Sequence, residues 1–407
     1  MNRKKGNRQD IKIYIFVFLF SIVFLVVGNS IASSHKTNLT IPDYESELEN
    51  QVFAKVVKVD SVAPNPDDSS TDILRFTATI AAGKQKGASV QATQYVYKNN
   101  DTMPSAVKAN DNVVLASLST NGATEWAFEN YNRIGQIAIL VFVFAAFVLI
   151  LGGWKGMSTI LSLTFTCLSL FYVYIPFLIA GYNIYAATVI ICIYIIGISF
   201  IFTGGVNQKS LAAAIGCAGG VVFSGVIYRY MEAVMKLTGY YNDETSRLFQ
   251  IFGQGNLNLK GVVFAMVTIG ALGGTMDVAM SIASSLDEIR TERAVTKYDL
   301  IRSGLNIGKD IMGTMANTLI LAYIGSSLVM VLIYGVSNYP LFQLLNKEEI
   351  IIEMLQSLIG SLGMLFTIPF TTVVSSILFT ARKEEAEPLP YGRKQQTGMK
   401  RPGGYRQ

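Results

Sequence analysis

The sequence predicts an α-helical, polytopic membrane protein of about eight transmembrane helices, with a small extracytoplasmic all-β domain of the OB type after the first helix. Three observations predict this fold class. Of the 407 residues, 51% are hydrophobic and only 15% are charged, whereas soluble domains hold about a quarter charged residues. Apolar runs long enough to cross a membrane fill most of the chain. One polar block of strand-like segments interrupts them.

The chain begins with a basic, polar segment and an apolar run. Residues 1–10 read MNRKKGNRQD, and residues 13–28 read IYIFVFLFSIVFLVVG. This pattern is typical of a first transmembrane helix or of a signal peptide, for which SIAS at 30–33 would serve as the cleavage site. The apolar run is long for a signal peptide, which favours an uncleaved helix. Residues 1–33 are therefore interpreted as the basic N-terminus and the first helix.

Residues 34–133 form the polar block. Its segments are rich in Val, Thr, Ile and Tyr with partial alternation, and clusters of turn residues separate them. This pattern predicts an extracytoplasmic β-domain, a five-stranded barrel of the OB type. The block has no aromatic and basic pattern typical of nucleic-acid binding and no acid cluster for a metal, so we expect neither partner. The strand-like stretches are QVFAKVVKVDS, DILRFTATIAA, SVQATQYVYK and DNVVLASLS.

From residue 134 the chain is almost continuously apolar. About 20 residues cross a hydrocarbon core of roughly 30 Å, and this length divides 134–381 into a membrane domain of about seven helices. Residues 382–407 remain as a basic tail. Between the first two helices, Gly152 and Gly153 beside Trp154 predict a tight turn. The predicted helices are 134–152, 158–180, 184–204, 210–235, 261–285, 308–336 and 354–381.

The basic residues give an independent test of this arrangement. An even number of helices places both termini on one side, and the loops and ends of that side are rich in Lys and Arg. Because cytoplasmic loops carry the excess of positive charge, both termini are expected in the cytoplasm and 34–133 outside it. The basic residues of the first side include Arg3, Lys4, Lys5, Arg8, Lys155, Lys209, Arg290, Arg293, Lys297 and Arg302, and those of the other side are Arg247, Lys260 and Lys347.

Two predicted helices carry an acid on a stripe of small or polar side chains at helical spacing. An ionisable side chain in hydrocarbon costs roughly 2.5–3.5 kcal/mol, so it normally faces a protein interior or a water-filled cavity. The two stripes therefore predict a substrate or ion pathway. Its residues are Asp277, Ser281 and Ser284 on the first helix, and Asp310, Thr314 and Asn317 on the second.

The alternative for the two acids is a structural pair that holds the helices together through hydrogen bonds to neighbouring side chains. At 1.5 Å per residue, Asp277 is expected about 13 Å from the inner boundary and Asp310 about 6 Å. Asp310 is then partly hydrated, whereas Asp277 needs a cavity to reach water. A carboxyl group at that depth suits a residue that takes up a proton or binds a cation.

Other motifs narrow the class of protein. The three cysteines lie in apolar segments without a CxxC pair, so neither a disulfide framework nor a zinc site is expected. No G-x-x-x-x-G-K-S/T motif occurs, which argues against ATP hydrolysis, and no cofactor is expected. Gly216, Gly219, Gly220 and Gly225 predict close helix packing. Pro369 predicts a kink in a helix whose Ser and Thr residues either satisfy local carbonyl groups or face a pathway.

Two stretches carry a family resemblance, GALGGTMDVAMSIASSLDEI at 270–289 and SGLNIGKDIMGTMANTLILAYIGSSL at 303–328. They resemble the signature of the YibE/F-like family of bacterial multi-pass membrane proteins. The resemblance is expected to run from the β-domain through the last helix. It implies a bacterial cytoplasmic membrane and a permease-like role, and it brings no substrate with it.

These observations favour a permease or secondary transporter in the lipid bilayer, with a polar pathway between the two acid-bearing helices and an unknown small solute or ion as substrate. One alternative is a non-transporting membrane scaffold that recruits an envelope partner through its β-domain. A truncation of 40–130 would then abolish function, whereas Asp277→Asn would be harmless.

A further alternative is an intramembrane aspartyl hydrolase that uses Asp277 and Asp310 as an acid–base dyad. Such proteases resemble this chain in placing one Asp on each of two consecutive helices, with a G-x-G-D pattern at the second. Here Ile307-Gly308-Lys309-Asp310 lacks the first glycine. The expected depths also differ by about 7 Å, whereas a dyad needs adjacent carboxyl groups. An enzyme is therefore not expected.

Overall fold

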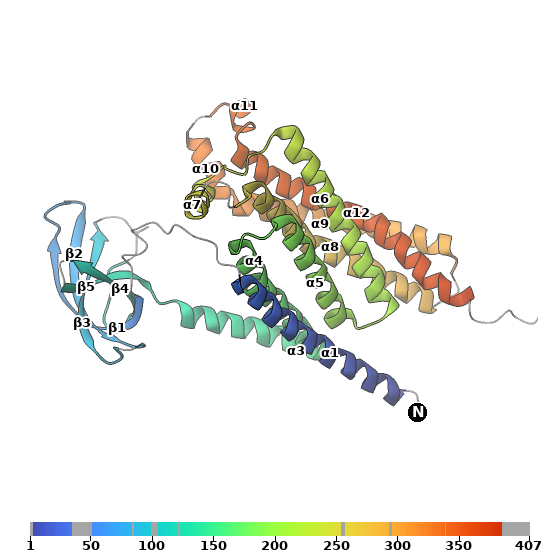
Figure 1. Ribbon diagram of the computed structural model, residues 1–407, viewed down its shortest axis with the longest axis horizontal. Coiled ribbons are helices and arrows are strands. Elements are labelled where there is room, and N and C mark those ends of the chain that lie inside the picture. The colour runs from blue at the N-terminus through green and yellow to red at the C-terminus, as the bar shows by residue number, and fades with distance from the viewer. Residues whose placement is uncertain are drawn as a thin grey trace, which may run out of the picture. The chain divides into compact units, whose positions relative to one another are not determined.

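The computed structural model describes residues 3–34, 51–83, 85–98, 105–120, 123–253, 257–292, 295–337 and 339–384 (Figure 1). These residues are mostly helical, with one small β-barrel towards the N-terminus. The chain divides into two compact units, each assembled from separate stretches. Unit 1 comprises Met1–Thr203, Glu232–Ala265 and Asn346–Ile350, and unit 2 comprises Gly204–Met231, Met266–Leu345 and Ile351–Gln407.

The barrel of unit 1 closes in the order β1-β2-β3-β5-β4. β3 and β5 pair in parallel, whereas the other pairs are antiparallel. Alternate side chains of β2, from Leu74 to Ile80, point inward and are buried, as the period of a strand requires. The strands are β1 (Gln51–Pro64), β2 (Thr71–Ile80), β3 (Ser89–Tyr97), β4 (Asn112–Thr120) and β5 (Ala123–Tyr131). The small five-stranded barrel predicted for 34–133 is therefore confirmed, and residues 35–50 of that block lie outside the described residues.

One buried amide ties the barrel core to the segment before β4. Gln94 of β3 donates from Nε2 to the carbonyl oxygen of Ser105 (3.1 Å) and accepts at Oε1 from the backbone N–H of Val107 (2.9 Å). Val107 and Trp126 belong to the same buried cluster. The amide thus satisfies backbone groups that would otherwise be buried without partners.

Two acids, the exposed Asp60 and the half-buried Asp68, brace the β1–β2 hairpin. Asp60 accepts from Thr77 Oγ1 at 2.6 Å and pairs with Lys58 at 2.9 Å. Asp68 accepts from the Oγ and the backbone N–H of Ser70. The hydrogen bond from Thr77, followed by that from Lys58, holds the pKa of Asp60 below its ordinary value, and the two bonds from Ser70 do the same to the pKa of Asp68.

The first helices of unit 1 are α1 (Arg3–Ser34) and a long helical stretch made of α3 (Ile134–Ser169), the π-helix η1 (Leu170–Tyr174) and α4 (Ile175–Ile179). Inside α3, Gly153 has φ 53° and ψ −125°, a conformation that favours glycine. Gly156 lies so close to the carbonyl oxygen of Val148 that a Cβ there would overlap it. Residues eight apart in a straight helix are separated by about 12 Å. The chain therefore folds back at Gly153, beside the exposed Trp154, which confirms the predicted turn.

The other elements of unit 1 are α5 (Ile184–Gly204), except its last residue, and α7 (Asp243–Phe252). Aromatic contacts attach α1 to its neighbours, because the Phe24 ring stacks on Tyr194 at 4.0 Å. The carboxylate of Glu348, where α12 begins, accepts the backbone N–H groups of Thr238 (2.6 Å) and Gly239 (2.7 Å). An acid in a first helical turn also interacts favourably with the helix dipole.

Unit 2 contains most of the remaining helices. α9 begins with a capping box, in which Thr296 and Asp299 each accept a hydrogen bond from the other's backbone N–H. Near the end of α8, Arg290 pairs with Asp287 (2.7 Å), donates to Gln208 of α6 (2.9 Å) and lies over the ring of Phe379 of α12. These helices are α6 (Gln208–Met235), α8 (Leu259–Glu292), α9 (Lys297–Ser326), α10 (Leu328–Val336), α11 (Leu341–Leu344) and α12 (Glu348–Glu384). The end of α6 from Glu232, the start of α8 up to Ala265 and the start of α12 up to Ile350 belong to unit 1.

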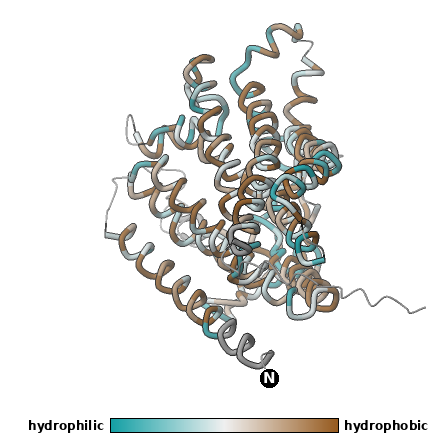
Figure 2. The backbone as a smooth tube through the Cα atoms, turned by 90° about the vertical axis from the view of Figure 1, so that its right-hand side faces the viewer, coloured by the Kyte–Doolittle hydropathy of each residue, from teal (hydrophilic) through white to brown (hydrophobic). Residues whose placement is uncertain are grey.

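The chain is a membrane protein with several transmembrane helices. In the described ranges six helices are long and apolar enough to cross a membrane, and the bent pair of α9 and α10 makes up to seven. Figure 2 shows hydrophobic residues along most of the length of these helices. The count of about eight differs because the predicted helices 134–152 and 158–180 both lie in Ile134–Ile179, a stretch of 46 residues. Forty-six residues rise about 69 Å, more than twice the roughly 30 Å of a hydrocarbon core.

The predicted span 308–336 also differs, because α9 ends at Ser326 and α10 follows after a bend of 58°. The last predicted span, 354–381, lies within α12, which starts at Glu348. α12 is one continuous helix with Pro369 inside it, so the predicted kink does not end the helix there. Residues 385–407 of the predicted tail lie outside the described residues.

Candidate functional site

α12 carries a row of buried hydroxyl groups within unit 2. Thr367 donates to the carbonyl oxygen of Gly363 (2.9 Å), one helical turn earlier. The hydroxyls of Thr371, Thr372 and Ser375 have no hydrogen-bond partner among the described residues. All the members of this row are fully buried, and they are Thr367, Thr371, Thr372, Ser375 and Ser376. The polar stripe of α12 therefore faces neighbouring helices and not the lipid.

A ladder of contacts joins α12 to α6. Three pairs make it, each four residues from the next along both antiparallel helices: Gly216 with Thr371, Gly220 with Thr367, and Ser224 with Gly363. In each pair a hydroxyl oxygen lies against a glycine, where a Cβ would overlap it. Small residues at this spacing let membrane helices approach closely. The packing predicted from the glycines of α6 is confirmed.

α8 and α9 pack on α12 as well. Thr275 of α8 lies 3.4 Å from the thiol of Cys217 on α6, and Gly274 lies against the sulfur of Met364. On α9, Gly304 contacts Thr372 of α12, and Gly308 contacts Ile368. The buried residues of α9 are Leu300, Gly304 and Gly308, one helical turn apart. One face of each helix thus packs in unit 2.

The acid stripe of α8 lies on the opposite face. Thr275, Val278 and Ile282 are buried, whereas Asp277 and Ser281 are exposed within the described part of the chain. Ser284 is half-buried. A Cβ added to Gly273, one turn before Asp277, would meet no atom within 4 Å. The side of α8 that carries Asp277 is therefore open.

The stripe of α9 is open in the same way. Asn306, Asp310, Thr314 and Asn317 are exposed. Thr314 donates to the carbonyl oxygen of Ile311 (2.9 Å) within its own helix. Asp310 is about half a turn away from the buried Gly308, on the side of α9 that does not pack on α12.

The structural-pair alternative requires hydrogen bonds from the two acids. Among the described residues neither Asp277 nor Asp310 forms a hydrogen bond or an ion pair, with each other or with Ser281, Ser284, Thr314 or Asn317. Both acids therefore lie in apolar helices, on open faces and without a partner charge. No group of three or more His, Cys, Asp or Glu residues that could hold a metal ion occurs in the described ranges.

A second polar group lies where α9 breaks. Ser327, between α9 and α10, donates from Oγ to Oε2 of Glu353 on α12 at 2.7 Å. The hydroxyl of Tyr323 lies against Gly270 of α8, and the buried Nε2 of Gln356 has no hydrogen-bond partner among the described residues. Broken helices beside polar groups are common in transporters.

Sequence reasoning missed this group for two reasons. Glu353 is one residue outside the predicted span 354–381, and the prediction of one continuous helix over 308–336 hid the break. The available signal was the pair Ser326-Ser327 after Gly325, because Gly and Ser are frequent where helices kink.

The comparisons with known proteins bear on the same helices. A sequence model of the YibE/F-like protein family matches residues 140–381, more than half of the chain. The chain belongs to this family. The match includes the α6–α12 ladder, both acid stripes and the break at Ser327, so the family's sequence pattern covers the whole candidate site.

The match begins inside α3, so the expected extent from the β-domain was too wide. The barrel of this YibE/F-like protein stands outside the matched residues. No curated protein matches the chain, and no solved structure matches it.

Proposed function

We propose that this YibE/F-like protein is a permease or secondary transporter, with a pathway for a small solute or ion along the open stripes of α8 and α9. The observation that carries the proposal is the open, unpaired state of Asp277 and Asp310 within apolar helices. A structural tie would bury both acids with a partner. Acids that remain without one are available to a proton, a cation or a substrate.

The cost of charge in hydrocarbon supports this role. Because roughly 2.5–3.5 kcal/mol opposes an ionised Asp at the centre of a span, the open faces must meet water or a polar ligand during function. The residues around the acids are small or polar, as Gly273 and Ser281 on α8 and Gly313 on α9 illustrate, and they leave room for such a ligand. In this proposal Asp277 takes up and releases the coupling ion.

The topology of the proposal follows from the chain's charges and turns. The reversal at Gly153 divides Ile134–Ile179 into two crossings, which brings the total to eight. Both termini then lie in the cytoplasm of a bacterial cell, with the barrel outside, as the distribution of Lys and Arg favours.

The test is ion flux with purified full-length protein in liposomes that contain a pH-sensitive dye, under imposed proton, Na⁺ and K⁺ gradients. The variants are Asp277→Asn and, as a matched control, Glu129→Gln, an exposed acid on β5 of the barrel and outside the proposed pathway. We expect flux in the wild type and in the control, and its loss in Asp277→Asn at unchanged stability. Unchanged flux in Asp277→Asn would show that this acid does not couple transport.

One observation favours the scaffold alternative. Val57 and Val62 of β1 and Tyr95 of β3 are large apolar side chains that the barrel leaves exposed, on the two strands that flank β2. If wild-type protein moves neither protons nor these cations, recruitment of an envelope partner through the barrel becomes the better proposal. It predicts that Tyr95→Ser together with Val62→Ser abolishes the cellular function, whereas Asp277→Asn preserves it.

A further inference from the structure

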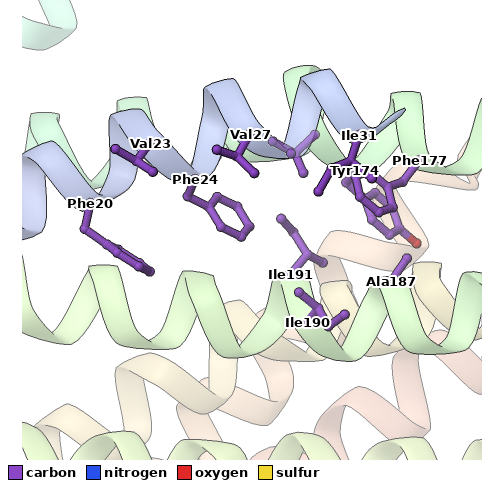
Figure 3. Close-up of a pocket in the computed structure, with 12 residues that line it drawn as sticks. Phe20, Val23, Phe24, Val27, Ile31, Tyr174, Phe177, Ala187, Ile190 and Ile191 are labelled. Atoms are coloured by element: carbon purple, nitrogen blue, oxygen red, sulfur yellow. The ribbon is translucent and has the colours of Figure 1, made fainter. Parts of the chain in front are cut away.

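A cavity of about 320 Å³ lies in unit 1 between α1, η1–α4 and α5 (Figure 3). Along α1 it extends from Phe20 to Ile31. Ile190 and Ile191 of α5 form the facing wall in the close-up, and Tyr174 and Phe177 lie at one end beside Ile31. Neither the family match, which begins at residue 140, nor the proposed pathway in unit 2 assigns a role to this cavity.

The local structure explains why the space is open. η1 is a π-helix, whose wider turn displaces the side chains of Val173 and Tyr174 relative to a regular α-helix. α1 approaches Val173 through Gly28, where a Cβ would crowd the valine side chain. The Phe24 ring then stacks on Tyr194 and separates α1 from α5. α1 thus contacts η1 at Gly28 and α5 at Phe24, and the cavity lies beside these two contacts.

The walls offer no partner for water. The only polar side-chain atom of the lining residues is the hydroxyl of Tyr174, which is 2.9 Å from Thr188 Oγ1. Thr188 in turn donates to the carbonyl oxygen of Ile184 (2.7 Å). A buried water needs two to four polar partners, and apolar cavities without them stay dry. The occupant must therefore be apolar.

The position and size of the cavity identify the kind of occupant. α1 and α5 are both helices that can cross a membrane, so the cavity lies at the depth of lipid chains. The eleven-residue separation of Phe20 and Ile31 corresponds to about 16 Å of helix, which is half of a hydrocarbon core of roughly 30 Å and matches the thickness of one leaflet. The volume is about twice that of an engineered apolar cavity of 150 Å³ that binds benzene, which leaves room for one chain.

We propose that this cavity binds a single acyl chain of a membrane phospholipid, along α1 within one leaflet, with the headgroup outside the cavity. The chain would fill the space between α1 and α5 and so attach α1 to the rest of unit 1. This binding is independent of transport in unit 2. If the cavity binds no acyl chain, the proposed transport function is unaffected. If the protein transports nothing, the lipid-binding proposal is unaffected.

The experiment uses full-length protein in vesicles of phosphatidylglycerol and phosphatidylethanolamine that contain a phospholipid with a photoreactive diazirine on one acyl chain. After illumination, labelled peptides are quantified by mass spectrometry. We expect the label to concentrate on the peptides of α1 and α5 that contain Val23, Ile190 and Ile191. Val27→Trp, which fills the cavity, should lower this labelling about tenfold, the effect of excluding a few methylene groups from an apolar site.

The matched control is Val143→Trp, the same substitution at another exposed valine of unit 1 that does not line the cavity; the exposures of Val27 and Val143 are 48% and 42%. The control should leave the labelling of α1 and α5 unchanged. Ala187→Leu is a smaller filling substitution and serves if Val27→Trp does not fold. Labelling spread evenly over all exposed helices, or equal labelling in the wild type and a folded filling variant, would overturn the proposal.

Discussion

Gly220 offers the sharpest test of the packing in unit 2. A Cβ at this position would overlap Thr367 Oγ1 and would lie 2.8 Å from the carbonyl oxygen of Gly363 and 3.2 Å from Thr275 Cγ2. The second of these is a backbone atom of the antiparallel helix, which cannot rotate away. Gly220→Ala therefore forces α6 and α12 apart.

The magnitude follows from two opposing effects. Overpacking of a well-packed core costs about 1–3 kcal/mol, whereas replacement of a helical Gly by Ala gains about 0.5–1 kcal/mol. The matched control is Gly313→Ala in α9, where an added Cβ meets no atom within 4 Å and only the gain applies. The two variants should therefore differ in free energy of unfolding by about 1–3 kcal/mol, with Gly220→Ala the less stable.

The assay is equilibrium unfolding in mixed detergent micelles, with helical circular dichroism as the signal. A third variant, Gly220→Ala with Thr367→Ala, removes the overlapping hydroxyl and should recover part of the loss, because residues in contact couple. The recovery stays partial, since the carbonyl oxygen of Gly363 remains in place. Equal stability of Gly220→Ala and Gly313→Ala would refute the ladder.

Three other predictions follow from the described contacts. Gln94→Leu should destabilise the barrel by about 1–3 kcal/mol, because the buried N–H of Val107 loses its acceptor. Thermal unfolding followed by the fluorescence of Trp126 measures this loss, and Gln91→Leu, at an exposed position of the same strand, is the control. Glu353→Gln should loosen the Ser327 break and raise amide hydrogen exchange in α10, because a charge-assisted hydrogen bond is lost; unchanged exchange there would contradict the role of Glu353. Asp60 and Asp68 have pKa values below the ordinary 3.8 in the folded protein. The stability that their carboxylates give to the hairpin is therefore complete above pH 3.8 and is lost as the pH falls through the lower folded values. Amide exchange in the β1–β2 hairpin should rise below pH 3.8, and the double variant Asp60→Asn with Asp68→Asn should remove that rise.

Much of the fold could be predicted because its signals are local. Alternating residues and turn clusters marked the barrel, and the glycines of α6 and the pair Gly152-Gly153 marked a close helix contact and a reversal. Helical spacing also placed Asp277 with Ser281, and Asp310 with Thr314, on common faces. These patterns depend on neighbours within one element.

The direction in which those faces point could not be predicted. A polar stripe in a membrane helix normally faces the protein interior. In this chain the stripe of α12, from Thr367 to Ser376, packs inward, whereas the stripes of α8 and α9 are open. Which stripe packs depends on where glycines of other helices meet it, as Gly216 meets Thr371 and Gly304 meets Thr372. Such pairing of distant residues leaves no mark in a single sequence window.

The reversal at Gly153 also has a practical consequence for spectroscopy. The chain has two tryptophans, and one, Trp154, is 80% exposed beside that reversal, whereas the other, Trp126, is 9% exposed in the barrel core. Their emission should differ in wavelength and in access to a soluble quencher, because one indole is open to its surroundings and the other is enclosed. With Trp154 replaced by Phe, intrinsic fluorescence becomes a reporter of the barrel alone; with Trp126 replaced, it reports on the chain reversal at Gly153. One protein thus carries two built-in optical probes, each in a different part of its structure.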